Sequence, residues 1–178
     1  MTQFSAELVE LLDSHIRDVP DFPEPGVLFR DITPLLADGP AFGSLVAALA
    51  EHYRGSVDAV AGLESRGFIL AAPLAYALGS GMITVRKAGR LPGPVDGVDY
   101  TLEYGTARLE VRPETVGEGQ RVLIIDDVLA TGGTASAAIR LIEGAGGRVT
   151  ALAMLLELAE LRGRDKLVGY QVDSILRY

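Results

Sequence analysis

Apolar residues follow two kinds of pattern along this chain, and the two alternate. Largely apolar runs predict strands, and runs without polar alternation are typical of strands buried on both faces, as in a parallel sheet. Such runs lie at 57–63, 82–87, 122–125, 148–156 and 170–175. Helical spacing predicts helices at 5–19, 38–53, 68–78, 135–142 and 162–168. The alternation predicts an α/β fold of three layers with a mainly parallel central sheet, in a single domain over residues 1–178.

Two segments lack this periodicity. Residues 20–36 are rich in proline and cannot form a regular helix, yet they carry Phe22, Leu28 and Phe29. A flat apolar face of this kind suits a planar purine, so the residues alone leave open a structural loop and a base-binding hood. Residues 88–112 join a glycine- and proline-rich stretch to an alternating strand pattern, and they predict a mobile functional flap.

The composition narrows the possible functions. The net charge is −8, from 24 acidic and 16 basic residues, which argues against a nucleic-acid-binding protein. A small anionic substrate needs only local positive charge. Without cysteine the chain forms no disulfide and no thiolate metal site, and we expect a cytoplasmic location. The longest apolar run, 68–78, is far too short to span a membrane, so no membrane partner is expected.

The richest local pattern lies at 121–134. We expect its strand to end at Asp126 and Asp127, and a short loop with Gly132 and Gly133 then leads into a helix. Backbone N–H groups and the positive end of a helix bind phosphate, while the two acids suit sugar hydroxyls or hydrated Mg²⁺. The stretch therefore predicts a site for a ribose 5-phosphate. The plainer alternative is a strand end with two capping acids and a glycine turn.

A second anion site is predicted at Glu64-Ser65-Arg66-Gly67, which also joins a strand to a helix. A salt-bridged arginine in an ordinary loop is the alternative. His15 and His52 have no partner at metal-ligand spacing, so histidine catalysis is not expected.

The stretch V-L-I-I-D-D-V-L-A-T-G-G-T resembles the phosphoribosyl pyrophosphate (PRPP) signature of the type I phosphoribosyltransferases. F-P-E-P-G-V-L-F-R-D-I-T-P, A-G-L-E-S-R-G, and R-K-A-G-R-L-P-G followed by L-E-Y-G resemble the hood, pyrophosphate loop and catalytic flap of its adenine-using members. The resemblance implies the fold of that family, with a small hood at about 20–36 and a flexible flap at about 88–112. It also implies the reaction adenine + PRPP → AMP + pyrophosphate, a homodimer, and Mg²⁺ held mainly by PRPP and water.

The resemblance also assigns roles to residues around adenine. Phe29 would stack on the base, backbone groups of Leu28 and Arg30 would read its edge, and Leu158 would pack on its opposite face. Glu103 would accept the proton that adenine loses, with Tyr104 beside it over the site.

The remaining roles concern the charged parts of PRPP. Ribose and its phosphate would be bound by Asp126 and Asp127 together with Ala130, Thr131, Gly132, Gly133 and Thr134. The pyrophosphate ligands implied are Glu64, Ser65, Arg66, Arg86 and Lys87. Arg66 and Lys87 would stabilise the leaving group, and either Arg86 or Lys87 would act across the dimer interface.

Two rival functions share this site. A transferase for another base, a 6-oxopurine or orotate, would differ only in a few hydrogen bonds to the base. A regulatory PRPP sensor would need a basic surface or an added nucleic-acid domain, which the charge of −8 and the presence of Glu103 disfavour.

Overall fold

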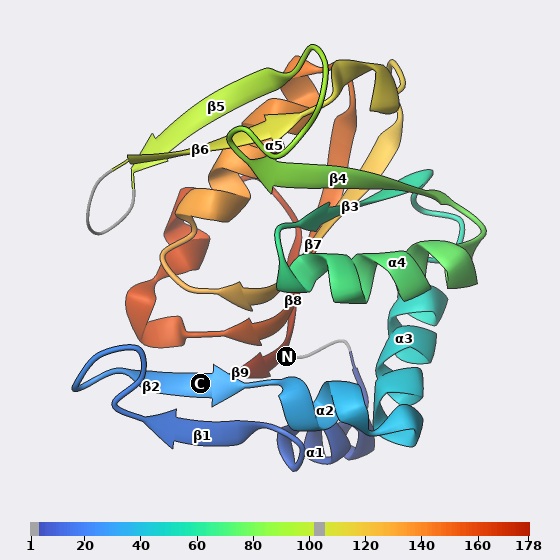
Figure 1. The fold of residues 1–178 in the computed structure, drawn as a ribbon. Helices are drawn as coiled ribbons and strands as arrows, with labels where there is room; N and C mark the ends of the chain where they lie inside the picture. Colours follow the sequence, from blue (N-terminus) through green and yellow to red (C-terminus); the bar gives the residue numbers. More distant parts are fainter. Residues whose placement is uncertain (1–3, 102–105) are drawn as a thin grey trace.

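The structure is a computed structural model and describes residues 4–101 and 106–178. Within these residues the main sheet has seven strands in the order β5-β6-β4-β3-β7-β8-β9 (Figure 1). They are β3 (Ala59–Leu63), β4 (Gly81–Lys87), β5 (Asp96–Thr101), β6 (Thr106–Val111), β7 (Arg121–Leu129), β8 (Arg148–Glu157) and β9 (Val172–Arg177). Neighbours from β4 to β9 are parallel, whereas β6 pairs antiparallel with β4 and β5. The predicted α/β fold with a mainly parallel sheet is confirmed.

Helices cover both faces of this sheet. They are α1 (Ala6–Asp13), α2 (Thr33–Ala37), α3 (Gly39–Tyr53), α4 (Arg66–Leu78) and α5 (Gly133–Gly144). Leu123 and Ile125 of β7 belong to the core cluster that contains α3 and α4, whereas Val122 and Ile124 belong to the cluster that contains α5. Successive strand residues point to opposite faces, so β7 is buried on both, as its unbroken apolar run predicted.

The N-terminal part differs from the prediction. The helix expected over 5–19 ends at Asp13, and Arg17–Pro20 forms strand β1, which pairs antiparallel with β2 (Leu28–Asp31). Antiparallel pairing with β2, the next element along the chain, overrides the helical spacing that continues to Ile16. This two-stranded sheet lies at the opposite end of the molecule from the β5–β6 pair (Figure 1).

The central strand is also longer than predicted. It does not end at Asp126, because β7 continues its parallel pairing with β8 as far as Leu129 opposite Glu157. The helix predicted at 162–168 is a short 3-10 helix, η3 (Gly163–Lys166); two others are η1 (Pro113–Thr115) and η2 (Ala159–Leu161). None of the helices in the described part of the chain is long and apolar enough to cross a membrane.

Candidate active site

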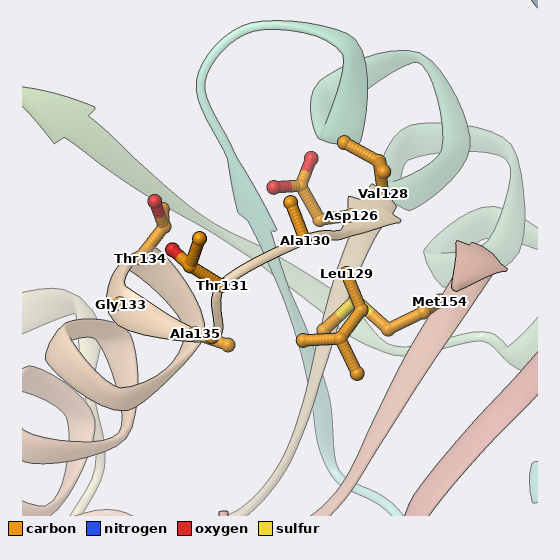
Figure 2. A pocket seen from close by; sticks show the side chains of 10 residues that line it. Asp126, Val128, Leu129, Ala130, Thr131, Gly133, Thr134, Ala135 and Met154 are labelled. Atoms are coloured by element: carbon orange, nitrogen blue, oxygen red, sulfur yellow. The ribbon is translucent and has the colours of Figure 1, made fainter. Parts of the chain in front are cut away.

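The carboxyl end of β7 leads into a loop that lines a cavity of about 130 Å³. Asp126, residues 128–135 and Met154 form its wall. Figure 2 shows the carboxylate of Asp126 and the hydroxyls of Thr131 and Thr134 on the same side of this loop. Because α5 begins at Gly133, its free N–H groups lie at the same place, as an anion site requires.

Gly132 is required by the shape of this loop. Its φ is +75°, in the left-handed region, and a Cβ atom there would lie 2.3 Å from the carbonyl oxygen of Gly163. No other residue type fits both conditions without moving backbone. The tight turn lets backbone N–H groups of the loop approach a ligand closely.

Asp126 and Asp127 lie side by side on β7, and the N–H of Asp127 donates to Oδ1 of Asp126 at 2.9 Å. The Asp127 side chain is only 5% exposed, and its Oδ2 lies 2.9 Å from Nη2 of Arg66. That contact lacks the alignment of a hydrogen bond, so within residues 4–101 and 106–178 the buried Oδ2 accepts none. A buried oxygen in this state is a ready acceptor for ligand hydroxyls.

The surroundings of both acids disfavour their charged forms. Burial raises the pKa of Asp126, and the neighbouring charge of Asp127 raises it further. Burial also raises the pKa of Asp127, although the guanidinium of Arg66 acts in the opposite direction. The acid pair therefore carries a desolvation cost that a hydrogen-bonding or cationic ligand would offset.

The loop between β3 and α4 carries the second predicted anion site. Gly67 holds this loop against β7, since a Cβ atom there would lie 2.8 Å from the Ile125 carbonyl oxygen and 2.9 Å from Oδ1 of Asp126. The Glu64–Ser65 peptide bond before it is cis. Both anion loops therefore meet at the carboxyl ends of neighbouring parallel strands, the usual ligand position in such sheets.

Glu64 connects this loop to β4. Its Oε1 lies 3.2 Å from Nη2 of Arg86, and its Oε2 accepts the N–H of Lys87 at 2.9 Å. Burial works to raise the pKa of Glu64, but the hydrogen bonds from Lys87 and Arg86 outweigh it and leave that pKa lowered. The side chain of Lys87 is exposed. Glu64 thus fixes the guanidinium of Arg86 and the backbone of Lys87, two residues predicted to meet pyrophosphate.

A second cavity, of about 140 Å³, lies beside the first, and Val128 and Ala130 line both. Its walls are mainly apolar, and Phe29 and Leu158 are among them. The complete lining is Val27, Leu28, Phe29, Arg30, Arg66, Asp127, Val128, Ala130, Leu156 and Leu158. We call residues 130–134 the phosphate loop. The apolar slot can hold the base of a nucleotide while the phosphate loop beside it binds the phosphate.

The structure brings most of the predicted site residues together. Leu28, Phe29, Arg30, Arg66 and Leu158 line the apolar slot. Asp126 and Asp127 of β7 lie next to the phosphate loop formed by residues 130–134. Glu64 contacts Arg86 and the backbone of Lys87. Ser65 is exposed at the start of α4. Glu103 and Tyr104 lie outside the described residues.

Sequence reasoning missed several wall residues. Val27, Leu156 and Met154 line the cavities, but each is an apolar residue in an apolar or hood segment, with no local signal of a site. The histidines take structural contacts: His15 Nε2 lies 3.6 Å from Asp38, and His52 Nε2 lies 3.3 Å from Asp173. The described residues contain no group of three or more histidine or acidic side chains that could hold a metal ion.

Comparison with known proteins adds independent findings. Residues 35–176 match the family model of the phosphoribosyl transferase domain. The chain is 52% identical over 176 residues to an adenine phosphoribosyltransferase of Arthrobacter sp. (strain FB24), covering 99% of this chain and 95% of that protein.

Two solved structures are also similar. The adenine phosphoribosyltransferase of Thermoanaerobacter pseudethanolicus superposes with a TM-score of 0.92 at 47% identity, covering 96% of this chain and 99% of the other. The enzyme of Saccharomyces cerevisiae, complexed with an imino-altritol bisphosphate and adenine, gives a TM-score of 0.92 at 36% identity, covering 97% and 100%.

Proposed function

Because this chain belongs to the phosphoribosyl transferase family, we propose that it transfers the 5-phosphoribosyl group of PRPP to adenine and releases AMP and pyrophosphate. The observation that carries this function is the pair of adjoining cavities, one at the glycine loop after β7 and one between the hood and Leu158. A purine in the slot and a ribose phosphate on the loop together make a nucleotide. The reaction belongs to purine salvage.

The acid pair binds the ribose in this proposal. Hydroxyls of the sugar would donate to the buried oxygen of Asp127 and to Asp126, while the 5-phosphate rests on the N–H groups at the start of α5. As pyrophosphate leaves the anomeric carbon, positive charge develops on the ribose ring. The nearby carboxylates stabilise that positive charge, because electrostatic attraction is strong over a short distance in a poorly solvated site.

Positive charge on the protein stabilises the departing pyrophosphate. Arg66 stands at the start of α4, and Glu64 orients Arg86 and the backbone of Lys87 beside it. Mg²⁺ fits this donor set, since it is usually held by one or two carboxylates together with substrate phosphates and water. Asp126 and Asp127 would hold it through its water ligands, and when bound it supplies charge that offsets the pyrophosphate.

The base lies in the hood slot. Phe29 would stack on adenine, and Leu158 would close the opposite face. Backbone groups of Leu28 and Arg30 would read the base edge. We propose that Glu103 accepts the proton that the incoming adenine loses. Closure of the flap over Gly89 to Gly97 would exclude water that could hydrolyse PRPP.

Glu103→Ala tests the proton-transfer role. It should lower the turnover number far more than it raises the KM of adenine or PRPP, because the side chain is needed in the transition state. Steady-state kinetics with both substrates measures this. An unchanged turnover number would remove Glu103 from the chemistry.

We also assign a homodimer in the cytoplasm. Ile69 and Tyr76, seven residues apart on α4, are 44% and 90% exposed, which gives that helix an apolar outer face that a second subunit could cover.

The cytoplasmic location is supported by the absence of cysteine, because such a chain needs no oxidising compartment to form disulfides.

The function is tested by a base screen. Purified protein with PRPP and Mg²⁺ is offered adenine, guanine, hypoxanthine, xanthine or orotate, and pyrophosphate release is followed. Release with adenine alone is expected. Release with another base in its place would keep the PRPP site but overturn the adenine assignment, and PRPP binding without release for any base would indicate a sensor.

A further inference from the structure

An ion pair between β8 and η3 joins the buried carboxylate of Glu157 to the half-buried guanidinium of Arg164, and it has no part in the chemistry above. Nε of Arg164 donates to both carboxylate oxygens of Glu157, at 2.7 and 2.8 Å. The Glu157 side chain is only 4% exposed. Arg164 also donates to the carbonyl oxygen of Val172 at 2.8 Å and to Oγ of Ser174 at 3.1 Å, so it fastens η3 to both β8 and β9.

Each partner of this ion pair adjoins a wall of the candidate active site. Glu157 immediately precedes Leu158, which lines the apolar slot. Arg164 immediately follows Gly163, which packs against the phosphate loop. A Cβ atom at Gly163 would lie 2.3 Å from the carbonyl oxygen of Ala130 and 3.0 Å from the backbone nitrogen of Gly132. The contact is therefore one of backbone against backbone.

We propose that Arg164 is a positioning residue that sets the spacing between the base slot and the phosphate loop. The proposal rests on the transferase function given above. The planar guanidinium binds the carboxylate through several donors at once, so it fixes direction as well as distance. By binding Glu157, Arg164 fixes the end of β8, which Leu158 follows directly. By anchoring η3, Arg164 also keeps Gly163 in contact with the phosphate loop. A nucleotide that spans both cavities needs Leu158 and the phosphate loop at a fixed distance from each other.

The two roles, positioning and simple stabilisation, predict different kinetics. A purely structural ion pair would affect the melting temperature and leave the KM values of the folded enzyme unchanged. A positioning residue would affect the KM of PRPP and of adenine even where the enzyme is fully folded. Small displacements of binding groups have large effects on such constants.

The test compares Arg164→Met with Arg177→Met. Arg177 is the matched control because its Nε lies 3.7 Å from the same carboxylate, while its side chain is 62% exposed on β9. At a temperature where both variants are folded, we expect Arg164→Met to raise the KM of both substrates and the Kd of AMP by about tenfold or more. We expect the control to stay within about twofold of the unchanged protein.

Arg164→Lys separates charge from geometry. It keeps the charge but lacks the planar fork, so it should recover only part of the lost AMP affinity. If Arg164→Met does not fold, Glu157→Gln replaces it, because the amide keeps the shape and loses the ion pair; the same rise in both KM values is expected.

Two failures are distinguishable. If the unchanged protein makes no AMP from adenine and PRPP, the transferase function fails, whatever Arg164 does. If it makes AMP, and the folded Arg164 or Glu157 variant has the same KM values as Arg177→Met, the positioning role alone is overturned.

Discussion

At the scale of single residues, Asp127 shows how a buried charge is kept for a ligand. Its carboxylate is almost enclosed, Arg66 lies beside it, and Oδ2 accepts no hydrogen bond from the residues that the structure describes. Burial raises its pKa despite Arg66. The folded protein therefore holds a buried acceptor, and the proposed function assigns it to the ribose hydroxyls of PRPP.

Asp127→Asn should accordingly weaken PRPP binding and spare the fold. We expect the Kd of PRPP to rise about 10- to 100-fold, the usual effect of losing a hydrogen bond to a charged group. Isothermal titration with PRPP and Mg²⁺ measures this, and unchanged affinity would rule out the ribose role.

The same variant should alter the pH dependence of stability in a known direction. For an acid whose pKa is raised by folding, the unfolded chain loses its proton first, so stability falls as pH rises above the ordinary value of 3.8. Asparagine lacks this penalty. The gain in melting temperature of Asp127→Asn over the unchanged protein should therefore be larger at neutral pH than near pH 4, measured in paired thermal scans without ligand.

At the scale of elements, the sequence predicted best what depends on neighbouring residues. The glycine loop after β7 and the Glu64 loop before α4 could be found because strand, loop and helix start are contiguous. The extent of β7 beyond Asp126 could not, because its pairing with β8 is set by residues far along the chain. β1 was predicted as helix because the helical spacing of apolar residues continues to Ile16, although its pairing partner β2 follows directly in the chain.

The apolar slot shows the same limit within the site. The stacking role of Phe29 and the packing role of Leu158 were assigned from the resemblance, and Val27 and Leu156 were not found at all. These residues come from the hood, from the end of β8 and from the residue that follows it, and only the tertiary fold places them around one cavity. Local apolar residues carry no mark that separates a binding wall from the core.

Phe29→Ala tests the hood. Loss of base stacking costs about 1–3 kcal/mol, so the KM of adenine should rise about 5- to 150-fold while that of PRPP stays nearly constant. Phe22→Ala is the control, because Phe22 packs edge-on against Phe29 at 5.2 Å but is 51% exposed. An equal effect of both variants would mean that Phe29 acts through the packing of the hood and not by contact with the base.

Gly132→Ala tests the shape of the phosphate loop, with Gly119→Ala as its partner. Gly119 also has a positive φ, +66°, but a Cβ atom there meets nothing within 4 Å. Its substitution should cost only the left-handed strain of about 1–2 kcal/mol. Gly132→Ala adds the clash with Gly163, so its loss in free energy of unfolding should be larger and PRPP binding should be lost. Denaturant unfolding of both variants measures the difference, and equal losses would show that the contact with Gly163 is unimportant.

At the scale of the whole molecule, charge and fold favour an enzyme over a regulator. A net charge of −8 opposes binding to nucleic acid, and the cationic groups Arg66, Arg86 and Lys87 are gathered at the ends of β3 and β4. Net charge can be counted from the sequence without knowledge of the fold. The sequence did not reveal the contact between Gly163 and the phosphate loop, which joins segments about thirty residues apart.

The proposed homodimer can be tested by subunit exchange, because either Arg86 or Lys87 is expected to act in the active site of the partner subunit. Arg86→Ala and Lys87→Ala are each mixed with Asp127→Asn and allowed to exchange subunits. For the cation that acts across the interface, a hybrid dimer has one site with an intact Asp127 and an intact partner cation. About half of the dimers are hybrids with one complete site each, so that mixture should regain about a quarter of full activity. With PRPP kept well below the Kd of Asp127→Asn, the other mixture should stay at the low activity of its parent variants, because a cation that acts within its own subunit leaves no complete site in any dimer. Activity in neither mixture, with exchange verified by differently tagged subunits, would show that each subunit works with its own Arg86 and Lys87.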